Sequence, residues 1–325
     1  MKVGITYDLQ EEYLVRGISK EDAAEFDRLD TIEAIDQTLR LLGFETDRIG
    51  HIQSLAKRLV AGNRWDLVFN IAEGIRGFSR EAQVPALLEA YDIPYTFSDP
   101  LVLCLTLHKG MTKRVIRDLG IPTPDFRIIE NEEEIPSADL PFPLFAKPVA
   151  EGTGKGIGAA SMIKNKRQLS TACRRLLKRF RQPVLVERFL PGKEFTVGVT
   201  GTGKSSVAIG AIEVILKKGA DVAAYSYHNK KHFEQVVEYR QGRDETAEKA
   251  VKLALSAWRG LGCRDGGRID LRADADGMLH FLEVNPLAGL NPEISDLPIL
   301  CRLAGVTYRE LISRIMDSAL MRIEP

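Results

Sequence analysis

Apolar and polar positions in the N-terminal part of the chain alternate between two periods. Residues 2–7 (KVGITY) follow the period of a strand, and residues 31–42 carry apolar positions at helical spacing until Gly43 ends the helix. A continuous apolar run at 65–74, an amphipathic helix near 81–91 and a short strand, IPYTFS, extend the pattern to about residue 98. Strands that alternate with helices predict a first domain built on a parallel sheet.

The remainder of the chain has a different pattern. A helix through KGMTKRVIRDLG precedes the strand PLFAKPV, which runs into a glycine-rich segment at 151–161. From residue 184 onward an antiparallel sheet is expected, with helices near 246–260 and 307–321 packed on it. Its predicted strands are VLVERFL, EFTVGVT, SVAIGAIEVI, GRIDLRA and MLHFLEVNP. The whole pattern indicates a mixed α/β (α+β) protein.

The charge balance and the apolar content of the chain argue against nucleic acid and membranes as partners. Lys plus Arg number 45 and so do Asp plus Glu, so the chain has no overall positive field to hold a nucleic acid or an acidic membrane surface. The first residues lack the apolar region of a signal peptide, and no apolar run reaches the roughly 18 residues of a membrane helix. We therefore expect a cytoplasmic protein with neither partner. The cysteines stand far apart and are expected to be reduced core thiols: Cys104, Cys173, Cys263 and Cys301.

Two glycine-rich segments are candidates for phosphate binding. Residues 198–205 match the P-loop pattern GxxxxGK[ST] with Lys204, but that loop requires a following helix, and the next residues, SVAIGAIEVI, alternate like a strand. A hairpin turn is favoured here, with a P-loop NTPase as the alternative. The segment 151–161 joins two predicted strands and could close over a nucleotide as a lid, with Lys147 on the strand before it.

Two acids and an amide near the C-terminus give the strongest chemical signal. Asp270 lies in the predicted strand GRIDLRA, and Glu283 and Asn285 share one face of the strand HFLEVNP because they are two residues apart. Carboxylate and amide oxygens suit Mg²⁺, which completes its coordination with water and substrate phosphates. The alternative is a surface charge cluster, but these acids interrupt apolar strands, and burying them without a metal or a partner is costly. A magnesium site is therefore predicted.

Several of these motifs together resemble the D-alanine–D-alanine ligase family of the ATP-grasp superfamily. FAKPVAEGTGKGIG is similar to the family's strand lysine and glycine loop, LVERFLPGKEFTVGV to its adenine-side hinge, and GRIDLR with FLEVNPLAGL to its magnesium-binding strands. The resemblance spans about residues 65–310. It implies a three-domain ATP-grasp architecture with an N-terminal α/β domain at 1–98, a central lid subdomain at 99–190 and a C-terminal catalytic subdomain at 191–325.

The resemblance also implies roles for individual residues. The ATP-binding set would be Lys109, Lys147, Glu187, Arg188, Phe189, Leu190, Glu194 and Lys230. Its lysines would touch phosphates, with Lys230 also catalytic because it would reach the transferred phosphate, while Glu187 to Leu190 would line the adenine and Glu194 would take the ribose. Two magnesium ions, or manganese in their place, would be held by Asp270, Glu283 and Asn285. Arg268 and the backbone N–H of Gly289 would stabilise the tetrahedral intermediate. The implied reaction joins a carboxylate to an amine through an acyl phosphate, with ADP and phosphate released.

The sequence departs from the family where the first substrate binds. The family's acid after the first strand, its loop serine and its tyrosine after the phosphate lysine are not matched, since Thr153 and Lys231 stand at the last two positions. The HGxxGEDG element is altered to AEGIRGFS, with Glu73 in place of histidine. Candidates to bind the first substrate are Glu73, Arg80 and Glu81, and those near the second are Tyr225, Leu290, Ser295 and Asp296. Which carboxylate and amine are joined stays open.

Plainer interpretations exist for each residue. Lys109 and Lys230 could be solvated lysines, Glu187 a surface acid at a strand edge, and Glu73, Arg80 and Glu81 a charged helix start. Arg268 could pair with Asp265. A protein with the same fold could be a nucleotide sensor rather than an enzyme, although the combination of Arg268 with the metal set argues against that. By resemblance, the expected partners are small-molecule substrates and a second copy of the chain in a homodimer.

Overall fold

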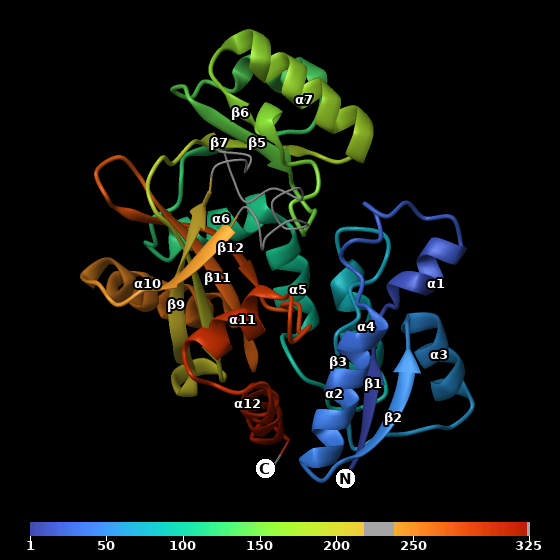
Figure 1. The fold of residues 1–325 in the computed structure, drawn as a ribbon. Helices are drawn as coiled ribbons and strands as arrows, with labels where there is room; N and C mark the ends of the chain where they lie inside the picture. Colours follow the sequence, from blue (N-terminus) through green and yellow to red (C-terminus); the bar gives the residue numbers. More distant parts are fainter. Residues whose placement is uncertain (218–236, 324–325) are drawn as a thin grey trace.

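The structure is a computed structural model that describes residues 1–217 and 237–323 (Figure 1). Two predicted site residues, Tyr225 and Lys230, lie outside the described residues. Three sheets organise the described chain, one of three strands, one of five and one of four. Figure 1 places the three-stranded sheet on the right, the five-stranded sheet at the lower left and the four-stranded sheet at the top.

The first sheet is parallel, as predicted. Its strand order is β2–β1–β3, and both pairs run parallel, with Val3 opposite Thr46 on one side and Leu67 on the other. The elements of this region are β1 (Lys2–Thr6), α1 (Gln10–Val15), α2 (Leu29–Leu41), β2 (Glu45–Gly50), α3 (Ile52–Val60), β3 (Leu67–Asn70), a 3₁₀ turn η1 (Arg80–Ala82) and α4 (Gln83–Glu89). The strand predicted from IPYTFS is wrong: a single bridge joins Tyr95 to Val68, and the positive φ of Phe97 ends any extension.

The five-stranded sheet is antiparallel and carries the predicted acidic strands. Its order is β10–β9–β8–β11–β12, so the last two strands lie side by side at one edge. The strands are β8 (Glu194–Thr200), β9 (Val207–Leu216), β10 (Val237–Gln241), β11 (Gly266–Ala273) and β12 (Leu279–Asn285). Helix α10 (Glu245–Leu261) begins at the Asp244 cap and packs its alanine-rich face and Trp258 against the sheet.

The four-stranded sheet is also antiparallel, in the order β4–β7–β5–β6. Its strands are β4 (Phe126–Ile129), β5 (Leu144–Pro148), β6 (Met162–Ile163) and β7 (Val184–Arg188), and α7 (Lys166–Phe180) covers one face together with the 3₁₀ turn η2 (Glu132–Ser137). The strand at 184–188 was predicted to belong to the C-terminal sheet, and that is wrong. It pairs with β4 and β5, because its continuous apolar run fits the centre of the smaller sheet.

The C-terminal helices link the three-stranded sheet to the five-stranded sheet. Helices α11 (Asp296–Leu303) and α12 (Tyr308–Leu320) contribute Leu297, Leu311 and Ile315 to the same core as Val3 and Phe69. The helix predicted near 307–321 therefore packs on the antiparallel sheet, as expected, and on α2 of the first region as well. Helices α5 (Pro100–Leu107) and α6 (Lys109–Asp118) run beside β12 and complete the connection.

The P-loop look-alike is a hairpin turn. Strand β8 ends at Thr200, a 3₁₀ turn η4 (Gly203–Ser205) follows, and β9 begins at Val207. Gly201 and Gly203 take positive φ values of 92° and 55°, which explains the glycines without any ligand. No helix follows Ser205, so the P-loop alternative is wrong.

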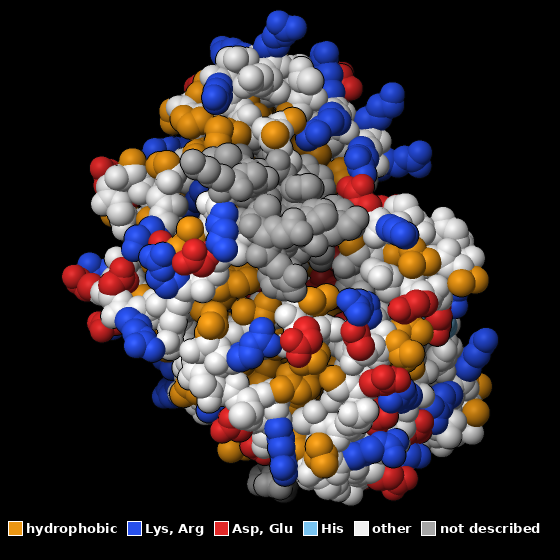
Figure 2. Space-filling model, in the orientation of Figure 1, with side chains coloured by type: hydrophobic (Ala, Val, Ile, Leu, Met, Phe, Trp, Pro, Cys, Tyr) orange, Lys and Arg blue, Asp and Glu red, His pale blue; other side chains and the backbone are white. Residues whose placement is uncertain are grey.

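The surface is mixed in charge, with one local exception. In Figure 2, Lys and Arg side chains gather on the upper lobe, where α7 has the sequence KRQLSTACRRLLKRF. Within residues 1–217 and 237–323, no helix is both long and apolar enough to cross a membrane. The four cysteines are free thiols, and three of them are buried, as predicted.

Candidate active site

A cavity of about 810 Å³, part of it open to solvent, lies where the four-stranded and five-stranded sheets meet. The glycine loop after β5 covers it, and β7, β8, β11 and β12 supply its walls. Predicted site residues that line it are Lys109, Lys147, Glu187, Arg188, Phe189, Leu190, Glu194, Arg268, Asp270 and Glu283. The predicted ATP and metal residues of the described chain are therefore brought together, Asn285 excepted, which lines the adjoining cavity.

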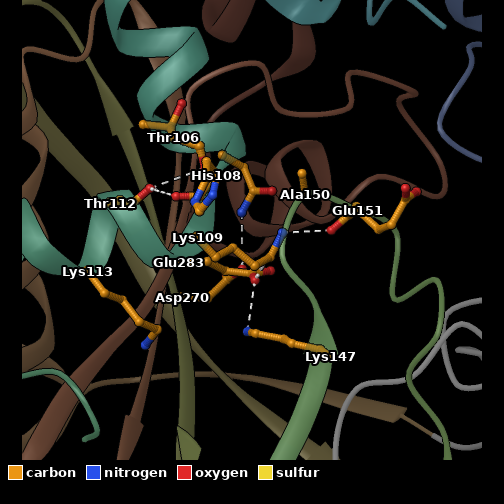
Figure 3. A network of polar contacts seen from close by, with 12 residues as sticks. Thr106, His108, Lys109, Thr112, Lys113, Lys147, Ala150, Glu151, Asp270 and Glu283 are labelled. Carbon is orange, nitrogen blue, oxygen red and sulfur yellow. Dashed lines mark hydrogen bonds and ion pairs between the residues drawn. The ribbon is translucent and has the colours of Figure 1, made fainter. Parts of the chain in front are cut away.

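Lysines and glutamates alternate at the back of this cavity (Figure 3). Lys147 reaches from β5 to Glu283 of β12 at 3.2 Å and lies 3.5 Å from Glu187 of β7. Lys109, at the start of α6, donates to the backbone oxygen of Glu151 at 2.6 Å and lies 3.9 Å from Glu283. Lys109 and Glu187 are not the solvated residues of the plainer interpretation, since their side chains are only 11% and 4% exposed.

Lys113, in α6, also belongs to this network through its ion pair with Glu187, and the sequence interpretation missed it. Its ammonium group lies 2.8 Å from Glu187 and also reaches Thr123 Oγ1 at 2.9 Å and the backbone oxygen of Phe281 at 3.3 Å. Lys113 is fully buried, so these three acceptors replace its hydration. Its four-residue spacing from Lys109 on one helix was the available signal, because residues i and i+4 share a helix face.

Burial and pairing compete to set the ionisation of these groups. Burial opposes the charge of Lys147, but Glu283 and Glu187 outweigh it and raise the pKa of Lys147. Burial likewise raises the pKa of Glu187, but Lys113 and Lys147 together hold it below the usual value. Burial is the dominant effect at Lys109, whose pKa is lowered. Mutual pairing thus favours the charged forms of Lys147 and Glu187.

Asp270 and Glu283 face each other across β11 and β12 as cross-strand partners. Asp270 accepts hydrogen bonds from Thr196 Oγ1 at 2.8 Å and from the Asn285 amide at 3.2 Å, and it pairs closely with Arg268. Among residues 1–217 and 237–323, no group of three or more His, Cys, Asp or Glu is arranged to hold a metal alone. Two carboxylates and an amide that need further oxygens fit Mg²⁺ bound together with nucleotide phosphates.

Arg268 and Gly289 lie together in a second cavity, of about 690 Å³, which adjoins the first. Lys109, Gly152 and Arg268 line both cavities, so the two share a wall. Arg268 pairs with Asp270 and lies 3.7 Å from Asp296. The plainer interpretation, in which Arg268 pairs with Asp265, is wrong, because Asp265 pairs with Arg322. A β-carbon at Gly289 would lie 2.8 Å from Ser295 Oγ, so only glycine fits at that position without displacing Ser295.

The first domain supplies an acidic wall to the second cavity. Glu25, Glu73 and Glu81 line it, opposite the loop Pro286–Gly289. Burial raises the pKa of Glu81 to about 7, with Glu25 adding to the shift and Arg80 opposing it. Burial also raises the pKa of Glu73, reinforced by Glu81 and Glu25. These carboxyl groups are not an ordinary charged helix start, because they face a cavity rather than bulk solvent.

Arg80 is placed differently from its predicted role. It is buried, and its guanidinium donates to the backbone oxygen of Ala150 at 2.9 Å and to Glu25 at 3.0 Å. Glu25 also accepts from the backbone of Gly152 and pairs with Lys155 at 3.3 Å. Arg80 therefore connects the first domain to the glycine loop and does not line either cavity.

The remaining predicted residues lie around the two cavities. Glu194 is 3.2 Å from Arg272, and burial raises its pKa. Asp296 accepts from the Tyr239 hydroxyl at 2.7 Å. Leu290 is buried, with its backbone oxygen bound by Tyr308, and Ser295 Oγ accepts from the backbone of Asn291. Leu290, Ser295 and Asp296 line neither cavity. Ser295 lies next to Gly289, and Asp296 lies 3.7 Å from Arg268.

Known proteins are similar to this chain in both sequence and fold. A family model described as the D-ala D-ala ligase C-terminus matches residues 115–317. The chain belongs to the D-alanine–D-alanine ligase family. D-alanine–D-alanine ligase from Aquifex aeolicus is 33% identical over 89% of this chain and 94% of its own length. The enzyme of the same name from Xanthomonas axonopodis is 32% identical, over 87% and 86%.

A solved member of the D-alanine–D-alanine ligase family has the same fold. The ligase from Bacillus anthracis, in complex with ATP, superposes with a TM-score of 0.75 over 99% of this chain and 98% of its own, at 20% identity. The predicted family, ATP-grasp fold and enzyme class, a ligase that forms a C–N bond with ATP, are confirmed. The nucleotide-sensor alternative is not favoured.

Three further residues near the cavities were missed by the sequence interpretation, and they come from different segments of the chain. Glu25 lines the second cavity, Arg272 lines the first, and Lys155 pairs with Glu25. Glu25 lies in the irregular stretch between α1 and α2, where periodicity carries no information about neighbours. Arg272 shares a strand face with Asp270 and Arg268, so its two-residue spacing could have revealed it.

Proposed function

We propose that this chain joins a carboxylate to an amine through an acyl phosphate formed with ATP in the first cavity. The observation that carries the proposal is the cross-strand pair Asp270 and Glu283, located where the nucleotide cavity adjoins a second cavity. Lys109 and Arg268 line both cavities, so one cation set can serve the phosphate chain and the reacting carboxylate together. Lys230 belongs to the proposed phosphate set but lies outside the described residues.

In the proposed first step, a substrate carboxylate oxygen attacks the γ-phosphorus and the bond to the ADP oxygen breaks. Lys109 and Lys147 hold the phosphate oxygens in line with the carboxylate and offset their charge. In the second step an amine nitrogen bonds to the acyl carbon and loses a proton. Arg268 and the Gly289 N–H stabilise the oxyanion of the tetrahedral intermediate before phosphate leaves.

Asp270, Glu283 and Asn285 would hold magnesium, or manganese in its place. When bound, the ion neutralises charge on the phosphate oxygens as a Lewis acid. The adenine is proposed to lie against Glu187, Arg188, Phe189 and Leu190, and the ribose against Glu194. Leu290, Ser295, Asp296 and Tyr225 are proposed on the second-substrate side.

The family also suggests how the chain is organised and where it acts. We propose three units with boundaries near residues 98 and 190, a homodimer formed through the first unit and a location in the cytoplasm. The substrates are proposed to be small molecules, an amino acid or another carboxylate and an amine. D-Alanine is one candidate. The altered first-substrate residues, Glu73 in particular, leave the choice to experiment.

The test is ADP and phosphate release from magnesium ATP across a panel of D- and L-amino acids, with mass spectrometry of the products. The expected result is that at least one pair of substrates gives a new amide together with equal amounts of ADP and phosphate. Bound ATP that no carboxylate and amine can turn over would contradict the ligase function and favour a nucleotide-binding role.

A further inference from the structure

The charges around the two cavities are balanced to different degrees. In the wall between the first domain and the glycine loop, Arg80 and Lys155 offset Glu25 and Glu151 through direct ion pairs. This group of four is electrically neutral. The Glu25 side chain is only 7% exposed, and its charge is offset by Arg80 and Lys155 within the protein.

Two carboxylates of the second cavity have no such partner. Glu73 and Glu81 form no hydrogen bond or ion pair through their side chains with any residue of 1–217 or 237–323. Arg80 and Lys109 are near enough to Glu81 to lower its pKa, but neither forms an ion pair with it. Arg80 is bound to Glu25 and to the backbone oxygen of Ala150, and Lys109 donates to the backbone oxygen of Glu151 and lies 3.9 Å from Glu283. Two acids that line this cavity therefore have no cation bound directly to them among the described residues.

The position of these acids in the reaction site gives them a role. The same cavity is lined by Lys109, Arg268 and Gly289, the groups proposed to bind the reacting carboxylate. A substrate that reacts at that end extends toward the first domain, where Glu73 and Glu81 lie. A monoamino acid brings a single ammonium group, which can pair with one of the two acids and leaves the other without a partner.

We propose that the carboxylate substrate of this chain is a diamino acid, whose two ammonium groups are bound by Glu73 and Glu81. This inference rests on the proposed ligase function and names the substrate class of the same site. Each ammonium group would form charge-assisted hydrogen bonds with a carboxylate in a sheltered cavity. Discrimination then comes from the second ion pair, which a monoamino acid cannot form.

The experiment compares ornithine with norvaline and lysine with norleucine, each as D and L forms, because each pair differs by the terminal ammonium group alone. ADP release is measured for each compound with a common panel of amines, and KM for ATP is measured alongside. We expect kcat/KM to favour the diamino acid by roughly 10- to 100-fold, the range of one charge-assisted hydrogen bond. Glu73→Gln and Glu81→Gln are expected to remove most of this preference and to leave KM for ATP unchanged.

Two controls separate this role from a structural one. Glu33→Gln removes an exposed acid from α2 and should keep the preference. Glu73→Asp and Glu81→Asp retain the charge and should restore part of it. Norvaline and norleucine that react as well as their diamino counterparts, or a preference that survives both Gln variants, would overturn this inference and leave the ligase function intact. If no carboxylate supports ADP release, the proposed function itself fails.

Discussion

The two adjoining cavities differ in how their charges are satisfied. At the back of the nucleotide cavity, Lys113, Lys147, Glu187 and Glu283 contact one another within 2.8 to 3.5 Å. On the first-domain wall of the second cavity, Glu73 and Glu81 contact no cation among the described residues, and the pKa of Glu81 is raised to about 7. A paired network keeps one charge state, whereas an unpaired one is poised to change it when a ligand arrives.

The difference separates what the chain shares with its family from what it does not. The residues of the paired network lie on β5, β7, β12 and α6, and Lys109, Lys147, Glu187 and Glu283 were all predicted site residues whose roles the family resemblance implies. The acids of the unpaired wall lie in segments that depart from the family pattern. The chemistry of the reaction and the choice of substrate are therefore located in different parts of the molecule, which makes them separable by mutation.

The largest effect is expected at the metal-binding strands. Asp270→Asn or Glu283→Gln should lower turnover by at least roughly 10²- to 10³-fold, because each removes a carboxylate from the charge stabilisation of the phosphates. ADP release measures the loss, and a thermal melt checks that the fold persists. Asp276→Asn, an exposed acid in the turn of the same hairpin, is the matched control. Wild-type turnover in either active-site variant would refute the metal assignment.

The paired network can be disrupted by replacing Lys113, the cation that pairs with Glu187. Lys113→Met leaves Glu187 buried with one cation fewer, so the free energy of unfolding should fall by about 3–5 kcal/mol. Urea denaturation measures the change. Lys57→Met, on the exposed face of α3, should alter it little. If Glu187→Gln is added to Lys113→Met, part of the loss should return, and a loss that stays complete would show that the charge of Glu187 is not its cause.

Glu81, on the wall of unpaired acids, should make the stability of the protein depend on pH. The folded-state pKa of Glu81 is about 7 against an ordinary 4.5, so the folded protein retains a proton that the unfolded chain releases. Stability should therefore be greatest below about pH 4.5 for this group and fall by roughly 1–3 kcal/mol as pH rises to about 7. Urea denaturation of Glu81→Gln across this range should show a shallower fall. An identical pH slope in the variant would mean that Glu81 ionises normally.

The smallest effect is expected at the P-loop look-alike. Lys204 is exposed in the turn between β8 and β9, away from both cavities, so Lys204→Ala should leave KM for ATP unchanged. Lys147→Met is the informative counterpart, since it removes a lysine from the nucleotide cavity. A large rise in KM for Lys204→Ala alone would revive a phosphate role for that turn.

The regular elements were predictable from the sequence because their periods are local. The two-residue spacing of Glu283 and Asn285 placed both on one strand face, and the alternation of SVAIGAIEVI excluded the P-loop helix. Sheet membership was less accessible. Strand 184–188 joins the smaller sheet, and IPYTFS forms only one bridge, because pairing partners are chosen by tertiary packing.

The acidic wall could be predicted only in part. Glu73 and Glu81 were candidates because they replace or follow family residues, whereas Glu25 was missed because it comes from an irregular segment. Arg80 was expected to grip a substrate carboxylate and instead binds Glu25 and the glycine loop. Such pairings join residues 55 to 70 positions apart in the sequence, and no local pattern encodes them.

The contrast between paired and unpaired carboxylates is tested most directly by calorimetry of ornithine and norvaline binding. The titrations are run at pH 7 in buffers of different ionisation enthalpy, with magnesium and a non-hydrolysable ATP analogue present. Because ammonium groups favour the ionised forms of Glu73 and Glu81, ornithine should release protons as it binds, and norvaline should release fewer and bind more weakly. Equal affinity and equal proton release for the two ligands would contradict the account.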